Sequence, residues 1–358
     1  MIKETIILVT GVGDYWGRRL ALYLLDQPGL RVIGLDRQPP TEKVPGLDFV
    51  QADVRNPLLV ELLRDEHIDV CYHLKFIPGD NGDELASEVN VQGTMNVVGA
   101  CAEAQVNQIV LRSSTMVYGA HADNAAFLTE SSPLRGGRQM TSIRDLVEIE
   151  SFVATFRRQE AQIKLTILRF ANIVGPTVNS PMTQLLTLPA PPVLLGFDPL
   201  LQFVHEDDVV GALVLSTNQG ADGVYNVAAA DPIPLSRALR LVGRRALPIF
   251  HPLAYRAAEW VSGPNTGSAS WTPLPWDYLR YRWTGDLKRM QEVLTFAPRY
   301  SAAEALQEVA HHHRTRADRD GAGNLAQDEE QLRNTLRHRR SMKETRKDES
   351  DADAGEQT

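Results

Sequence analysis

A glycine-rich loop near the N-terminus is the first segment whose composition suits a chemical task. Residues 10–17 read Thr-Gly-Val-Gly-Asp-Tyr-Trp-Gly, directly after an apolar run and at the start of an amphipathic segment. Backbone N–H groups in such a loop, together with the N-terminus of the next helix, bind phosphate groups. Gly11 permits a tight turn, and Gly17 permits close contact between helix and strand. Asp14 places a carboxylate near the expected phosphates, where it either weakens their binding or turns outward and caps the helix.

Polar residues follow the next apolar runs at matching places. Asp36 ends the second run, 19 residues after Gly17. A carboxylate there can accept hydrogen bonds from the ribose hydroxyls of a dinucleotide. Asp53 and His73 follow the third and fourth runs. The pattern predicts NAD as the cofactor, and Arg37 beside the carboxylate leaves NADP open.

The elements that must position these residues alternate regularly. Expected strands lie at residues 5–9, 31–35, 48–50, 69–73, 108–112 and 164–169, and expected helices at 17–25, 57–66, 89–104 and 144–156. This alternation predicts an α/β fold, a Rossmann-type doubly wound parallel sheet with a smaller C-terminal substrate-side subdomain. We expect residues 1–175 to form mainly the NAD(P)-binding domain. Residues 176–314 are then mainly the subdomain, with some Rossmann elements returning to the sheet, and residues 315–358 a tail.

Composition excludes several classes of function. The 358 residues carry a formal net charge of −8, which argues against nucleic acid as a partner. Apolar runs are of strand length, far short of the roughly 20 residues of a membrane span. The N-terminus lacks the pattern of a secretion signal, so we expect a cytoplasmic protein.

The C-terminal segment is charged in both signs. Its last 45 residues hold ten Lys or Arg and eleven Asp or Glu, a net charge of −1, which predicts a disordered or transiently helical tail. A basic block at residues 333–347 leaves binding of an unknown acidic partner open. Three adjacent histidines at 311–313 cannot all face one ion on a helix, and no metal site is predicted.

Further motifs in order along the chain resemble the extended short-chain dehydrogenases/reductases, also called the NAD-dependent epimerase/dehydratase family. Residues 90–96 are similar to the family's helix-four motif, 113–119 to its strand-five motif, and 168–176 and 203–209 to later motifs. The sequence resembles bacterial UDP-glucose 4-epimerase-like members with an atypical active site. The residue pattern and the resemblance together assign cofactor binding to Gly11, Gly13, Asp14, Tyr15, Trp16, Gly17, Asp36, Arg37, Asp53, Val54, His73, Leu74, Lys75, Asn90, Ser113 and Arg144. They assign substrate contacts to Ser114, Thr115, Asn172 and His205.

The proton relay of the resembling family is missing. Its members use a tyrosine and a lysine four residues apart, with a serine that positions the substrate oxygen. The serine corresponds to Ser114, but counting from Tyr118, with Glu148 as a check, places Met140 at the tyrosine and Arg144 at the lysine. Methionine has no proton to exchange, and arginine stays protonated at any relevant pH. Epimerases of the family also carry a phosphate-binding arginine where this chain has Leu201.

We therefore expect an NAD(P)-binding protein whose ordinary redox catalysis is impaired or rerouted. One alternative is an active nucleotide-sugar epimerase or oxidoreductase with a substitute proton donor, for which Tyr118, His121, Thr141 and Ser114 are candidates. A second alternative is a non-catalytic dinucleotide sensor or scaffold. The ligand is then a small-molecule substrate or a dinucleotide, and the resemblance implies a homodimer.

Overall fold

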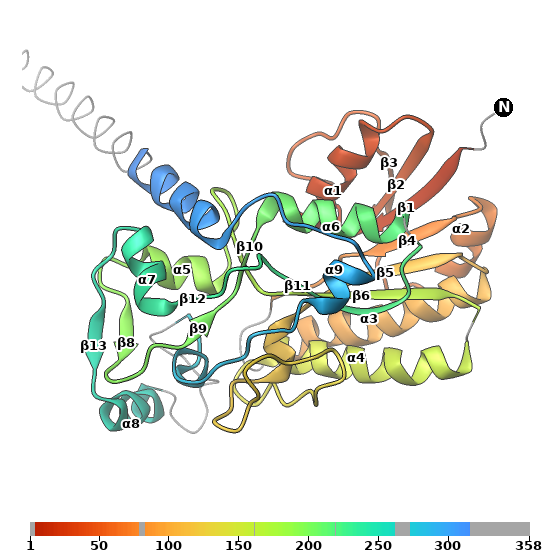
Figure 1. The fold of residues 1–358 in the computed structure, drawn as a ribbon. Coiled ribbons are helices and arrows are strands. Elements are labelled where there is room, and N and C mark those ends of the chain that lie inside the picture. Colours follow the sequence, from red (N-terminus) through yellow and green to blue (C-terminus); the bar gives the residue numbers. More distant parts are fainter. Residues whose placement is uncertain (1–3, 79–82, 161, 219, 262–272, 316–358) are drawn as a thin grey trace, which may run out of the picture. The chain divides into compact units, whose positions relative to one another are not determined.

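A central sheet of seven parallel strands organises the computed structural model (Figure 1). The structure describes residues 4–78, 83–160, 162–218, 220–261 and 273–315. Every neighbouring pair in the sheet is parallel, which confirms the doubly wound fold. In spatial order the strands are β11 (Gly223–Val227), β6 (Lys164–Phe170), β5 (Gln108–Ser114), β4 (Val70–His73), β1 (Thr5–Thr10), β2 (Leu30–Asp36) and β3 (Asp48–Gln51).

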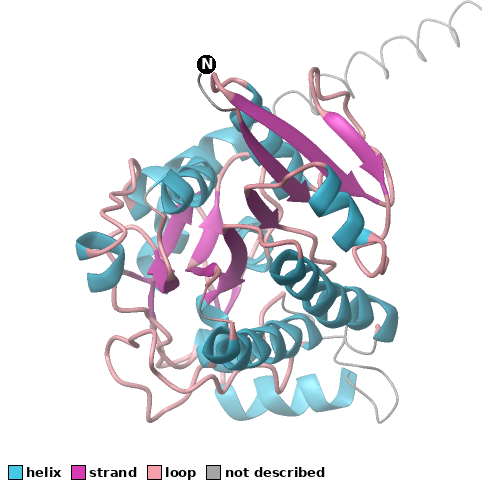
Figure 2. Cartoon of the chain, turned by 90° about the vertical axis from the view of Figure 1, so that its right-hand side faces the viewer, coloured by secondary structure: helices cyan, strands magenta, loops and turns pink. Residues whose placement is uncertain are grey.

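Helices cover both faces of this sheet, as Figures 1 and 2 show. One face packs against α1 (Tyr15–Leu25), α6 (Glu206–Asn218) and α9 (Lys288–Glu292), and the other against α2 (Leu59–Asp65), α3 (Glu84–Glu103) and α4 (Thr141–Gln159). Successive strand residues alternate between the two apolar cores, since Tyr72 belongs to the first and Cys71 to the second. Both faces are therefore buried, as a parallel sheet requires.

The chain beyond β6 forms shorter elements. Three two-stranded ladders pair β7 with β10, β9 with β12 and β8 with β13. Two elements of this part of the chain belong to the Rossmann domain: β11 is an edge strand of the central sheet, and α6 packs on one of its faces. The bounds are η1 (Thr115–Tyr118), β7 (Asn172–Val174), α5 (Pro181–Thr187), β8 (Pro192–Leu194), β9 (Leu200–Leu201), β10 (Phe203–His205), β12 (Ile233–Pro234), α7 (Leu235–Leu241), β13 (Leu247–Ile249), α8 (His251–Val261) and η2 (Trp276–Leu279).

The C-terminal region divides at residue 310. Residues 1–309 form one unit and residues 310–358 a second. Residues 302–315 are helical, and the tail expected from residue 315 lies, apart from that first residue, outside the described residues. Within the described ranges we find no helix with the length and apolar character that crossing a membrane requires.

Candidate functional site

The glycine loop between β1 and α1 requires glycine at two positions. Gly11 has φ +80°, and a Cβ there would lie 2.7 Å from the backbone nitrogen of Lys75. A Cβ on Gly17 would lie 2.1 Å from the carbonyl oxygen of Gly11. Both contacts are shorter than any side chain tolerates, so the loop and the first turn of α1 pack backbone against backbone. The loop therefore lies at the N-terminus of α1, where a Rossmann-type fold can bind phosphate groups.

Asp36 ends β2 directly beside this loop. Its side chain is 2% exposed and accepts hydrogen bonds from the backbone N–H groups of Gly13 at 3.1 Å and Arg37 at 2.7 Å. The Arg37 side chain is 65% exposed, and its Nε lies 3.6 Å from Asp53. Asp53 is held mainly by Arg55, whose hydrogen bonds lower the pKa of that carboxyl. Asp36 is therefore the carboxylate that faces the loop.

Lys75 joins the two carboxylates of the loop region. Its Nζ lies 3.0 Å from Asp14 and 3.0 Å from Asp36, and its side chain is 13% exposed. Burial works against its charge, but the bonds to Asp14 and Asp36 raise the pKa of Lys75. Asp14 is the N-cap residue of α1, yet its side chain makes no capping hydrogen bond. Burial raises the pKa of Asp14 despite the lysine. The Asp14 carboxylate is thus bonded to Lys75, which it shares with Asp36, and does not cap the helix.

Arg112 adds a second cation that the sequence reading missed. It stands near the end of β5, and its guanidinium carbon lies 5.7 Å from the ring centre of Trp16 in the first turn of α1. Burial lowers the pKa of Arg112 to about 10. Trp16 in turn packs edge-on against Tyr15 at 4.8 Å, and the Tyr15 hydroxyl donates to Glu206 at 2.8 Å. A basic residue immediately before Ser113 was visible in the sequence, but nothing there indicated that it faces α1.

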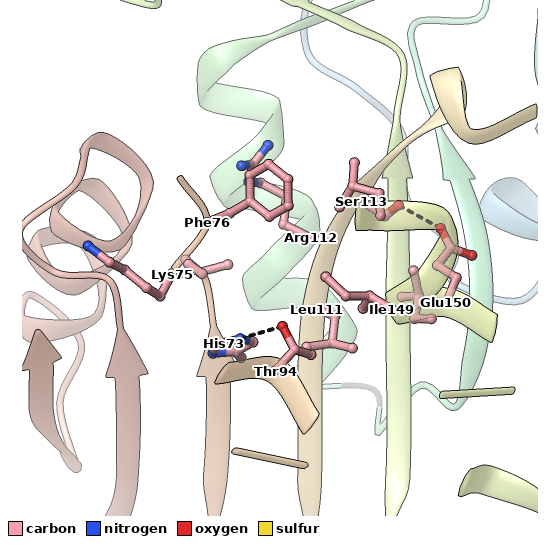
Figure 3. A pocket seen from close by; sticks show the side chains of 12 residues that line it. His73, Lys75, Phe76, Thr94, Leu111, Arg112, Ser113, Ile149 and Glu150 are labelled. Carbon is pink, nitrogen blue, oxygen red and sulfur yellow. Dashed lines mark hydrogen bonds between the residues drawn. The ribbon is translucent and has the colours of Figure 1, made fainter. Parts of the chain in front are cut away.

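A cavity of about 20 Å³ lies between the ends of β4, β5 and β6 and helix α4. That is room for about one water molecule, so a ring-sized group can enter only if side chains move. Figure 3 shows Phe76, Arg112 and Ile149 among the residues around it. Its lining residues are His73, Leu74, Lys75, Phe76, Thr94, Leu111, Arg112, Ser113, Leu146, Ile149, Glu150 and Ile167.

Helix α4 presents different residues to this cavity from those the sequence register predicted. Leu146, Ile149 and Glu150 line it, whereas Arg144 does not. The Arg144 side chain is 61% exposed and lines a groove of about 410 Å³ between α3 and α4 together with Glu148. Arg144, which we expected to bind the cofactor, is thus exposed between α3 and α4 and does not line the cavity beside β4 and β5.

The segment before α4 leads to another cavity. Met140 is the N-cap residue of α4 and lines a cavity of about 170 Å³ with His121, Gln139 and Tyr278. The structure therefore separates Met140 and Arg144 into two hollows, neither of which shares a lining residue with the cavity beside β4 and β5.

Two of the predicted cofactor residues are fully used by internal hydrogen bonds. His73 lies between the hydroxyls of Thr10 at 2.7 Å and Thr94 at 3.0 Å, and burial lowers its pKa to about 4. Asn90 is buried, and its amide bonds both backbone groups of Ile77. These side chains hold β1, β4 and α3 together and fix the chain after β4.

Ser113 and Ser114 differ in their surroundings. Ser113 donates to Glu150 at 2.6 Å, and Glu150 forms a buried ion pair with Arg169 at 2.5 Å. Ser114 accepts a hydrogen bond from the backbone N–H of Met116 at 3.2 Å and so caps η1. Ser113 therefore belongs to an internal network, while Ser114 is partly exposed at the end of β5.

The residues expected to contact substrate have partners within the protein. Thr115 is buried, and the Asn172 amide donates to a backbone carbonyl oxygen beside β10 at 2.8 Å. His205 lies 2.9 Å from Glu308 and stacks on Tyr300 with ring centres 3.9 Å apart.

Two apolar positions singled out in the sequence are packed inside the protein. Val54, expected to bind the cofactor, is buried where it contacts α3, since a Cβ on the helix residue Gly93 would lie 2.6 Å from it. Leu201 is 1% exposed, as an apolar core residue.

The fold, the glycine loop and the carboxylate at the end of β2 define a Rossmann-type protein of the short-chain dehydrogenase/reductase class. A model of the NAD dependent epimerase/dehydratase family matches residues 7–228. The chain belongs to that family.

Related proteins and solved structures agree with this assignment. An uncharacterized protein of Mycobacterium tuberculosis is 30% identical over an alignment of 343 positions, and the match covers 90% of each chain. Short-chain dehydrogenase/reductase family 42E member 1 of Xenopus laevis is 24% identical over 65% of this chain and 64% of its own.

Among solved structures, dTDP-glucose 4,6-dehydratase of Bacillus anthracis in complex with NAD has a TM-score of 0.66 at 16% identity, covering 87% of this chain and 97% of its own. UDP-glucose 4-epimerase of Thermotoga maritima with UDP-glucose has a TM-score of 0.64 at 16% identity, covering 87% of this chain and all of its own.

Proposed function

We propose that this protein binds NAD and that it lacks the tyrosine–lysine proton relay of its family, so that ordinary redox catalysis is impaired or rerouted. The observation that carries the proposal is the identity of the residues that α4 turns toward the cavity. They are Leu146, Ile149 and Glu150, and the only ionisable one, Glu150, is already paired with Arg169.

Dinucleotide binding is supported by the loop and by the carboxylate beside it. The glycine loop, packed backbone against backbone at the start of α1, suits the phosphates, and Asp36 suits the adenosine ribose hydroxyls. The negative charge of Asp36 favours NAD over NADP, because a 2′-phosphate would lie against it. When bound, NAD would accept or donate hydride at its nicotinamide ring.

The loss of proton transfer follows from helical periodicity. Side chains four residues apart lie on the same face of a helix, so the residue one turn before Leu146 on the cavity side is Ser142. The positions that could hold the tyrosine and lysine in this structure are therefore Ser142 and Leu146. Leucine carries no charge, and a serine hydroxyl is a poor proton donor at neutral pH. Neither assignment of the two positions, Ser142 and Leu146 from the structure or Met140 and Arg144 from the sequence, supplies a tyrosine–lysine pair.

The test uses the purified full-length protein. Calorimetric titration with NAD, NADH and NADP measures binding, and the absorbance of reduced nicotinamide follows hydride transfer from UDP- and dTDP-hexoses. We expect NAD and NADH to bind more tightly than NADP, with no reduction by any sugar. Absence of binding by both NAD and NADP at millimolar concentration would refute the proposal of a dinucleotide site, and rapid reduction would refute impaired catalysis.

A second candidate function rests on His121. Of the four substitute proton donors, Tyr118 is buried and its hydroxyl is bonded to Asn226 and Arg169; Thr141 is 8% exposed, and Ser114 caps η1. His121 instead lines the 170 Å³ cavity beside Met140. An active enzyme with a rerouted proton path would use this histidine, and His121→Gln would then abolish hydride transfer without changing NADH affinity.

The remaining assignments complete the proposal. Residues 1–175 with α6 and β11 would bind the dinucleotide, and the rest of residues 176–314 would face a small-molecule substrate. We also propose, from the family resemblance, a cytoplasmic homodimer through α3 and α4, which would cover Leu85, a leucine of α3 that is 72% exposed. Light scattering on the purified protein measures the dimer, and Leu85→Glu should dissociate it.

The charged tail, residues 315–358, is proposed to bind a partner. Deletion of the tail would then abolish capture of that partner in a pull-down experiment. A non-catalytic sensor would combine these features with NAD binding.

A further inference from the structure

Arg112 is a partly buried cation whose guanidinium is not bonded to any carboxylate of the described residues. Its Nε is inaccessible to solvent and has no hydrogen-bond partner among the described residues. The guanidinium also forms no ion pair with the residues the structure describes. Arg112 lines the same cavity as Phe76 (Figure 3), and its guanidinium carbon lies 5.7 Å from the ring centre of Trp16. A buried N–H without a hydrogen-bond partner is costly, and the rest of the guanidinium also has no hydrogen-bond partner in the described protein.

The nearby carboxylate acts on Arg112 through space and does not bond to it. Asp14 is the carboxylate that acts on it through space, but that carboxylate is bonded to Lys75 at 3.0 Å. Lys75 is shared with Asp36, so these three groups carry one positive and two negative charges. Because both carboxylates already have partners, the terminal N–H donors of Arg112 are left for a ligand beside the first turn of α1.

We propose that Arg112 binds the diphosphate of a nucleotide ligand at the glycine loop. The proposal rests on the proposed NAD site for the identity of that nucleotide. A guanidinium presents parallel N–H donors that match phosphate oxygens. It would add its charge to the N–H groups of the loop, where Asp14 reduces the positive potential of the helix N-terminus. Arg112 is thus a binding residue that offsets the carboxylate in the loop.

The experiment compares ligands that differ in phosphate. Calorimetry on the full-length protein measures binding of ADP-ribose, ADP and adenosine to the wild type, Arg112→Ala, Arg112→Lys and the control Arg64→Ala. The control removes an exposed arginine of α2 that pairs with Glu103. We expect Arg112→Ala to weaken ADP-ribose and ADP about 10- to 100-fold, the range for hydrogen bonds to charged groups. Adenosine should change less than about twofold, Arg112→Lys should be intermediate, and the control should match the wild type.

The outcomes separate this proposal from the proposed function. Equal weakening of adenosine and ADP in a folded Arg112→Ala variant, checked by circular dichroism, would show a packing role with Trp16 and overturn the proposal. Unchanged ADP binding would overturn it as well, as would failure of the wild type to bind ADP. A different outcome is that the wild type binds ADP but neither NAD nor NADP, and that Arg112→Ala loses ADP binding. This would support the diphosphate site and refute the dinucleotide function.

Discussion

The face that α4 turns toward the cavity can be tested by truncating two residues two positions apart. Arg144 is 61% exposed, so Arg144→Ala should change the free energy of unfolding by less than about 0.5 kcal/mol. Leu146 is 8% exposed and lines the cavity. Leu146→Ala should therefore cost about 2 to 4 kcal/mol, through lost burial and the hollow left behind.

The two variants should also differ in ligand binding. The cavity of about 20 Å³ leaves no room for a nicotinamide ring unless side chains move. Removing the leucine lowers that cost, so Leu146→Ala should bind NADH at least about threefold more tightly. Its affinity for ADP-ribose, which has no nicotinamide, should stay the same. Arg144→Ala should leave both affinities within about twofold.

Urea unfolding and fluorescence titration with NADH measure these quantities. Weakening of NADH by tenfold or more in Arg144→Ala, with ADP-ribose unchanged, would refute the assignment of faces, because Arg144 would then reach the nicotinamide. The same assignment predicts that Met140→Tyr with Arg144→Lys does not create hydride transfer, since residue 144 lies on the outer face. Any activity should come instead from Ser142→Tyr with Leu146→Lys.

Three further predictions concern the supports of the site. Burial holds the pKa of His73 at about 4, below the roughly 6.5 of an unfolded histidine, so the unfolded state binds more protons between those values. The free energy of unfolding should therefore fall by up to about 3 kcal/mol as the pH falls from about 6.5 to about 4. Urea titrations at each pH measure this dependence, and His73→Gln should flatten it. Glu150→Ala removes the ion-pair partner of the buried Arg169 guanidinium and should lower the free energy of unfolding in urea by about 3 to 5 kcal/mol. Glu103→Ala, at an exposed pair, should lower it by less than about 0.5 kcal/mol. Similar losses in the two variants would contradict a structural role for Glu150. Gly17→Ala places a Cβ 2.1 Å from the carbonyl oxygen of Gly11 and should weaken NAD binding, measured by calorimetry, about tenfold or more. The control Gly99→Ala, whose Cβ would meet nothing within 4 Å, should bind NAD with the affinity of the wild type. Equal affinities of the two variants would refute the close packing of the glycine loop.

Several features of the fold could be predicted from the sequence because they depend on local patterns. Parallel strands buried on both faces read as short apolar runs, and the glycine loop follows the first of them. Asp36 could be placed beside the loop because the carboxyl ends of parallel strands meet at one edge of a sheet. The structure agrees, since Asp36 accepts the N–H of Gly13 at 3.1 Å.

Side-chain roles were harder to predict because they depend on contacts between distant segments. His73 and Asn90 have residue types that suit a ligand, but their partners come from β1, α3 and the chain after β4. The bond partner of Asp14 is Lys75, 61 residues away. Such pairs have no signature in spacing, since only the folded sheet brings them together.

The sequence by itself determined the fold, the phosphate-binding loop, the carboxylate beside it and the absence of a tyrosine followed four residues later by lysine. Tertiary structure decided which residues of α4 face the cavity. Each residue turns a helix by about 100°, so a shift of two residues moves a side chain to the opposite face. Packing of α4 against the sheet sets that rotation, and it turns Arg144 outward and Leu146 inward.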